Sequence, residues 1–175
     1  MLKNIAIAVL VLIVGFLGFV FTRPDDYTVT RSTNIKASPE KVEALVADFH
    51  RWNEWSPWEK LDPEIKTTFS GAASGKGANY EWAGNDKVGQ GRMEILEVAS
   101  ASKVVIKLDF IKPFEDTSTT EFALASKADT TDVTWTMKGK NKFMGKLFSV
   151  FMNMDAMIGK DFENGLATMK IAAEK

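Results

Sequence analysis

Few side chains in this sequence have the chemistry of a catalytic group. The chain contains a single histidine, His50, and no cysteine. We find no Ser/His/Asp set, no Cys/His pair and no cluster of ligands that would hold zinc. The acid–base candidates that remain are His50 and the acidic pair Glu115-Asp116, and neither has a visible partner that would shift its pKa. We therefore expect no metal or other cofactor, and we favour a binding role over an enzymatic one.

A glycine-rich stretch, SGAASGKG at residues 70–77, superficially suggests a phosphate-binding loop. Its spacing is one residue too short, and Gly77 stands where such a loop needs serine or threonine. A strand pattern follows it, whereas a phosphate-binding loop must open a helix. We interpret this stretch as a hairpin loop.

Aromatic and methionine side chains recur at positions that would face one common space. In the predicted strands they share one parity, and near the C-terminus they recur at helical spacing. Aromatic rings with adaptable methionines are the usual lining of an apolar pocket, but the same side chains could fill the core and leave no void. Both interpretations stay open. The candidates for the cavity lining are Trp55, Tyr80, Trp82, Phe110, Phe122, Trp135, Met154, Met157, Ile158 and Phe162.

The elements that must position these side chains follow from the periodicity. Residues 27–36 alternate as a first strand, although Arg31 falls on the apolar parity. Its side chain is expected to reach solvent at a strand end, with a buried pair with a carboxylate as the alternative. Ser38 then caps a helix that has Pro39 at its first position. From residue 64 to residue 137, alternating runs separated by turn residues predict an antiparallel meander.

Turns and a final helix complete the pattern. Residues 52–58 carry three tryptophans in a turn that Pro57 keeps short, and we expect at least two indoles to pack it onto the sheet rim. A lid near a membrane surface is the alternative for this turn. Gly89-Gln90-Gly91 predicts a bulge or bend that curves the sheet. Residues 154–169 predict a long amphipathic C-terminal helix, with Asp155 as its cap.

The N-terminus carries a separate signal. The run Ile5–Phe21 has 17 residues without a charged side chain. As a helix it would span about 25 Å, close to the roughly 30 Å of a bilayer core. It lacks a small-x-small cleavage site, so we predict an uncleaved signal anchor in preference to a cleaved signal peptide. The predicted parts are a single-pass membrane anchor at 1–23 and a domain at 24–175, which we expect to lie outside the cytoplasm.

Five short motifs follow one another along the domain. They are I-x-A-x-P-E-x-V at 35–42, W-x-x-W-S-P-W at 52–58, G-A-x-Y-x-W at 77–82, G-x-G at 89–91 and I-G-x-D-F-E-x-G-L at 158–166. In this order they are similar to the polyketide cyclase/dehydrase-like branch of the START/Bet v 1-like (SRPBCC) superfamily, over about residues 27–174. The resemblance implies an α+β, helix-grip (Bet v 1-like) fold, in which a curved antiparallel sheet grips a long C-terminal helix around a cavity.

The family resemblance does not select one activity, because the superfamily includes both carriers and enzymes. We expect a membrane-anchored domain that binds or carries a hydrophobic small molecule or lipid. The alternatives are a polyketide cyclase/dehydratase-type enzyme and a ligand-free interaction module of the cell envelope. The formal net charge of −1 provides no basic surface for nucleic acid. Nothing in the sequence indicates an oligomeric state.

Overall fold

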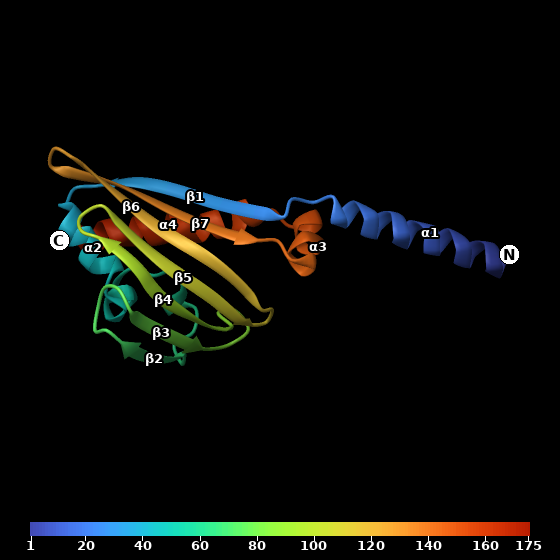
Figure 1. Cartoon of the computed structure of the whole chain (residues 1–175), viewed down its shortest axis with the longest axis horizontal. Coiled ribbons are helices and arrows are strands. Elements are labelled where there is room, and N and C mark those ends of the chain that lie inside the picture. The colour runs from blue at the N-terminus through green and yellow to red at the C-terminus, as the bar shows by residue number, and fades with distance from the viewer.

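The computed structural model describes residues 1–175, and it has two unequal parts (Figure 1). Helix α1, Leu2–Phe21, projects from one end of a rounded body that holds the other elements. It includes the whole apolar run Ile5–Phe21, and of its side chains only Val20 is buried. By length and composition it is the one helix that could cross a membrane.

The body is built on a seven-stranded antiparallel sheet in the order β1-β7-β6-β5-β4-β3-β2. Strands β2 to β7 form the predicted meander, and β1 pairs with β7 at one edge. The predicted α+β class and helix-grip arrangement are confirmed. The strands are β1 Asp26–Ile35, β2 Lys66–Gly71, β3 Ala78–Ala83, β4 Gln90–Ala99, β5 Lys103–Lys112, β6 Asp116–Lys127 and β7 Thr130–Lys140.

The sheet is irregular where the glycines predicted a bend. The pairing of β4 with β5 shifts between Gln90 and Gly91, and Gly89 adopts a positive φ of 65°. Gly91 has a second role, because the indole of Trp82 lies against it in the space that a Cβ would need. The curved sheet therefore has a concave face, and the long helix α4 lies along it (Figure 1).

Short helices cover one end of the concave face. Ser38 caps helix α2 as predicted, because its side chain accepts from the backbone N–H of Lys41. The tryptophan turn forms two short 3₁₀ segments, and two indoles anchor it as expected: Trp52 donates to the carbonyl of Val46 at 3.0 Å and Trp55 to that of Leu45 at 2.9 Å. These helices are α2 Pro39–Val46, η1 Phe49–Glu54 and η2 Trp58–Lys60.

Two helices close the chain, α3 at Phe143–Phe151 and α4 at Met154–Ala173. The predicted cap of α4 is wrong. Asn153 caps it by accepting from the backbone N–H of Ala156 at 3.0 Å, so the helix begins two residues earlier than a cap at Asp155 would require. Asp155 instead lies in the first turn of α4, where it faces a cation.

That cation is Arg31. Its place on the apolar parity of β1 left open whether its side chain reaches solvent or pairs with a carboxylate, and the structure shows the pairing. Its guanidinium pairs with Asp155 at 3.1 Å and with Glu163 at 2.9 Å. Gly159 lies between these two carboxylates in sequence, and a Cβ there would collide with the guanidinium. Arg31 therefore joins β1 to α4 through ion pairs with carboxylates, as in the second alternative, but these pairs are not buried, because the side chains of Asp155 and Glu163 are about half exposed.

Candidate functional site

The predicted cavity residues lie on the concave face or on α4, but they differ sharply in exposure. Those that are buried belong to strands β3, β6 and β7, to the tryptophan turn and to the middle of α4. The remainder are half-buried or exposed, and Met157 is 45% exposed. The buried residues are Trp55, Tyr80, Phe122, Trp135 and Phe162; the half-buried ones are Trp82, Phe110, Met154 and Ile158.

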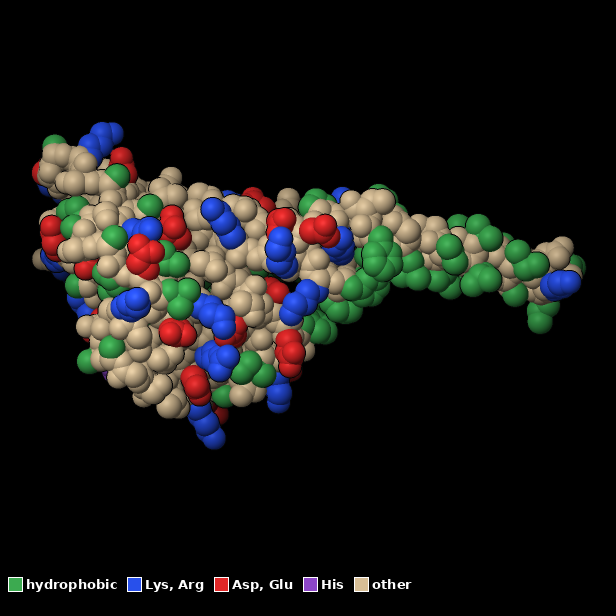
Figure 2. Space-filling view, viewed as in Figure 1, with side chains coloured by type: hydrophobic (Ala, Val, Ile, Leu, Met, Phe, Trp, Pro, Cys, Tyr) green, Lys and Arg blue, Asp and Glu red, His purple; other side chains and the backbone are tan.

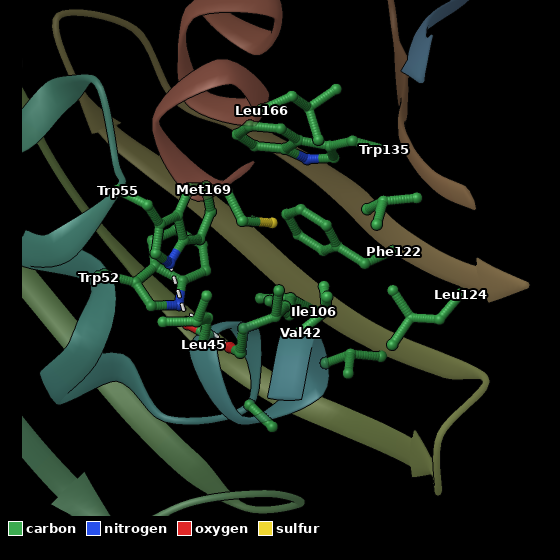
Figure 3. Close-up of a cluster of buried hydrophobic side chains, with 14 of the residues drawn as sticks. Val42, Leu45, Trp52, Trp55, Ile106, Phe122, Leu124, Trp135, Leu166 and Met169 are labelled. Atoms are coloured by element: carbon green, nitrogen blue, oxygen red, sulfur yellow. Dashed lines mark hydrogen bonds between the residues drawn. The ribbon is translucent and has the colours of Figure 1, made fainter. Parts of the chain in front are cut away.

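One part of the concave face is filled by side chains that touch each other. Trp135 and Phe162 stack with ring centroids 3.9 Å apart and planes 5° apart, so α4 is pressed directly onto β7. Phe122 stacks on the other side of Trp135 at 4.7 Å, and Trp55 meets it edge-on at 5.5 Å. Figure 3 shows the rings of Trp55, Phe122 and Trp135 together with apolar side chains of α2 and α4. We call this filled region, defined by Trp55, Phe122, Trp135 and Phe162, the closed end.

The neighbouring part of the concave face is less covered. Trp82, Leu108 and Phe110 point to the same side of the sheet as the buried core, yet each is only half-buried. Trp82 and Phe110 meet edge-on at 6.0 Å, and Ile158 of α4 is half-buried as well. We call this region, defined by Trp82, Leu108, Phe110 and Ile158, the open end. Half-exposed apolar side chains on an inward face are available to an apolar ligand.

Polar groups interrupt this apolar surface at one place. The strand register puts Ser118 directly opposite Leu108, and it puts Asp116 opposite Phe110. Ser118 is 2% exposed, and its Oγ is the one buried side-chain polar atom without a hydrogen-bond partner. A buried hydroxyl without a partner is uncommon, and a ligand polar atom would satisfy it.

A tyrosine completes the polar group. The hydroxyl of Tyr27 lies 3.3 Å from Asp116 Oδ2, and Tyr27 and Ser118 both pair with Gly139 across the sheet. Burial, and then the charge of Asp116, raise the pKa of Tyr27 to about 12, although the neighbouring Ser118 hydroxyl acts to lower it. The hydroxyl therefore keeps its proton at neutral pH and can donate a hydrogen bond. Apolar walls with a few convergent polar groups are typical of small-molecule sites.

Two hollows lie away from the open end. One, of about 230 Å³, is at the sheet rim between η1 and strands β2 and β3, where Tyr80 donates to Glu59 at 2.8 Å. Burial, and then Glu59, raise the pKa of Tyr80. His50 also lines it, stacked on Phe69 at 4.1 Å. The other hollow, of about 300 Å³, is bordered by Ser32 and Thr33 of β1 and by residues 163–174 at the C-terminal end of the chain.

The sequence reasoning missed part of this arrangement. Ser118 and Leu108 share the inward parity of their strands, so the alternation could have identified them. Only large aromatic and methionine residues were considered there. Tyr27 was identified as part of the first strand, but its position beside Asp116 depends on the pairing of β1 with β7, which no local pattern reveals.

Most of the chain outside α1 matches a known protein family. Residues 26–174 match the family model described as "Polyketide cyclase / dehydrase and lipid transport". A search of curated protein sequences gives no match.

Solved structures with the same fold are distant in sequence. Protein CV1439 from Chromobacterium violaceum is 14% identical with a TM-score of 0.62, over 85% of this chain and 97% of that one. Aha1 from Colwellia psychrerythraea, solved as a dimer, is 16% identical with a TM-score of 0.58, over 85% and 96%. The major latex-like protein 151 of Panax ginseng is 14% identical with a TM-score of 0.60, over 86% and 99%.

Proposed function

Because the chain belongs to the polyketide cyclase/dehydrase and lipid-transport family, we propose that it binds a hydrophobic small molecule or lipid at the open end of its concave face. One observation carries the proposal: half-exposed Trp82, Leu108 and Phe110 lie on the same face of the sheet as the buried Ser118, whose hydroxyl makes no hydrogen bond of normal geometry. An apolar ligand with one polar head would cover the side chains and satisfy the hydroxyl.

The site divides the predicted lining residues into two roles. Trp82, Phe110 and Ile158 would contact the ligand, with Met154 and Met157 as adaptable side chains on the same half of α4. Trp55, Phe122, Trp135 and Phe162 would form the wall behind it, since their rings already contact each other. Tyr80 borders the rim hollow and would lie outside the ligand site.

A membrane tether at residues 1–23 is the second part of the proposal, with the domain at 24–175 outside the cytoplasm. α1 is long and apolar enough to span a bilayer, and nearly all of its side chains are exposed. Phe16 and Phe21 also contact α3 through Phe151 and Phe143, at 6.0 and 5.7 Å. A helix that packs against the mature domain favours an anchor over a cleaved signal peptide. The ligand would then be drawn from the adjacent membrane.

A cyclase/dehydratase-type enzyme is the second candidate. Tyr27 donates its single hydroxyl proton to Asp116, and it would have to turn this O–H away from Asp116 to donate to a carbonyl oxygen of a substrate held at the open end. This role needs a ligand at the same place, so it is secondary to binding.

Native mass spectrometry of the detergent-purified full chain, with organic extraction, tests the binding proposal. We expect a co-purifying apolar molecule that Leu108→Trp displaces by filling the open end. The matched control is Leu96→Trp, at an exposed leucine of β4 outside this end. A wild-type protein that remains empty when offered lipids and other apolar molecules would overturn the proposal.

A further inference from the structure

Helix α3 carries an apolar surface that the body of the protein does not cover. Its side chains and those around it are exposed although they are large and hydrophobic, and Phe151 reaches 71% exposure. Clustered exposure of this kind marks an interaction surface. We call this surface the α3 patch, and it consists of Phe143, Met144, Phe148, Phe151, Met152 and, from the β5–β6 hairpin tip, Phe114.

The hairpin tip belongs to the same surface. The rings of Phe114 and Phe148 lie 5.5 Å apart, which joins the loop between β5 and β6 to α3. Figure 2 shows hydrophobic side chains running along α1 and continuing onto the adjoining end of the body. The patch is therefore continuous with the surface of the candidate membrane helix.

The contacts with α1 fix how deep the patch would lie. Phe143 touches Phe21, at the end of α1, whereas Phe151 touches Phe16, five residues earlier. Five helical residues correspond to about 7.5 Å along the axis. An interfacial amphipathic helix typically buries its apolar face about 5–10 Å into the boundary between headgroups and acyl chains. If α1 spans the bilayer, α3 lies at that depth.

The charges beside the patch are consistent with an interface and do not depend on anionic lipid. Lys146 pairs with Asp25, and Lys140 pairs with Asp26 at 2.6 Å. Lys142 donates to the carbonyl of Glu115 at 3.2 Å. Because these cations already have partners within the protein, attraction to anionic headgroups is not needed.

We propose that the α3 patch is a second membrane contact, inserted in the surface of the bilayer that α1 spans. It rests on the membrane tether of the proposed function and deepens it. Phe114 lies four residues after Phe110, so insertion of the hairpin tip holds the open end at the lipid surface. A lipid could then pass between bilayer and site without crossing bulk water.

The absence of cysteine makes the test direct, since single cysteines can be labelled in the full chain. An environment-sensitive fluorophore is attached to one cysteine at a time, and the labelled protein is inserted into phosphatidylcholine vesicles. The four variants are Phe151→Cys, Phe114→Cys, Val11→Cys and Lys127→Cys. Position 11 reports on α1, and position 127 reports on the β6–β7 end of the body. Quenching by nitroxide-bearing lipids is compared with quenching by aqueous iodide.

We expect labels at 151 and 114 to be quenched by nitroxides near the headgroups, and several-fold less by iodide than the label at 127. The result should be the same in low and high salt. If iodide reaches 151 and 114 as readily as 127 while 11 stays protected, α1 spans the membrane but the patch inference fails. If iodide also reaches 11, the tether itself fails. Protection of 151 from both quenchers would indicate a second protein copy and overturn the inference.

A substitution that places a negative charge in the α3 patch provides an independent test of its insertion. Phe151→Asp should move the label at 114 into water while the label at 11 remains protected, because a carboxylate opposes insertion. Ile171→Asp is the matched control, since Ile171 is an exposed apolar residue of α4 outside the patch. An unchanged label at 114 in the Phe151→Asp variant would contradict the proposal.

Discussion

The two ends of the concave face use the same kinds of side chain for different purposes. At the closed end, Trp135 lies between Phe122 and Phe162 with centroid distances of 4.7 and 3.9 Å. At the open end, Trp82 and Phe110 come within 6.0 Å of each other and remain half-buried. Apolar inward residues alone therefore do not define a ligand site. The distinguishing property is whether another part of the chain covers them.

The tryptophan turn and the middle of α4 cover the closed end. Trp58 meets both Trp135 and Phe162 edge-on, at 5.8 and 6.4 Å. The start of α4 instead contributes Met154, Met157 and Ile158, which are half-buried or exposed. The comparison implies that the closed end stabilises the fold, whereas the open end can be altered with little loss of stability.

The largest expected effect is at the closed end. Phe162→Ala removes a buried ring from a filled core and should lower the free energy of unfolding by about 3–5 kcal/mol. Met157→Ala, on the same helix at the open end, should change it by less than about 0.5 kcal/mol. Urea titration of both variants measures the difference. Equal losses would show that the two ends are packed alike.

The second-largest expected effect comes from a substitution that fills the open end. Leu108→Trp should reduce the amount of bound apolar ligand at least tenfold, because the indole would occupy ligand space. Stability should fall by less than about 1.5 kcal/mol, since Leu108 is only half-buried. Quantitative extraction and urea titration report the two quantities separately. A large loss of stability with ligand retained would place the ligand elsewhere.

A smaller effect is expected on the pH dependence of stability, and it involves a carboxylate on the outer face of β5. Burial pushes the pKa of Asp109 upward, but hydrogen bonds from Lys107, Thr117 and Arg92 outweigh it and hold the pKa at about 2, below its ordinary 3.8. A lowered pKa stabilises the folded protein above pH 4, and this contribution is lost as pH falls toward 2.

Asp109→Asn should therefore cost about 1 kcal/mol at neutral pH, allowing for solvent screening, and flatten the fall in stability between pH 4 and 2. Asp129→Asn, in the exposed turn between β6 and β7, is the control and should leave the acid profile unchanged. Urea titrations across that pH range measure both. An identical acid profile for wild type and Asp109→Asn would rule out this contribution.

A small stability effect is also expected at the buried hydroxyl of Ser118. Ser118 Oγ has no partner, so Ser118→Ala should change the free energy of unfolding by less than about 1 kcal/mol, in either direction. Thr120→Val should cost more, because Trp135 donates to its hydroxyl at 2.7 Å. A loss of ligand in Ser118→Ala without a loss of stability would identify the hydroxyl as a ligand contact.

Much of this fold could be predicted from the sequence because its patterns are local. The alternation in the strands identified the inward face, and Ser38 with Pro39 identified the start of α2. The first turn of α4 was harder, because Asn153 and Asp155 are both acceptable caps. The choice depends on Arg31 of β1, more than 120 residues earlier, which pairs with Asp155 at 3.1 Å.

The division of the site into two ends could not be predicted in the same way. Parity identifies Trp135 and Trp82 equally as inward residues. Phe162 of α4 covers Trp135 at 3.9 Å, whereas Trp82 stacks only on Tyr80 of its own strand, at 6.0 Å. Coverage depends on where α4 and the tryptophan turn rest on the sheet, which is a property of packing between distant segments. The polar group around Ser118 likewise follows from strand register.

Photo-crosslinking tests the central claim most directly. The full chain in phosphatidylcholine vesicles is irradiated with a diazirine-bearing fatty acid, and the modified peptides are mapped by mass spectrometry. We expect crosslinks at Trp82, Leu108 or Phe110 that excess unmodified lipid suppresses, together with crosslinks in α1. Labelling confined to α1 and the α3 patch, with none in β3 or β5, would contradict a ligand site at the open end.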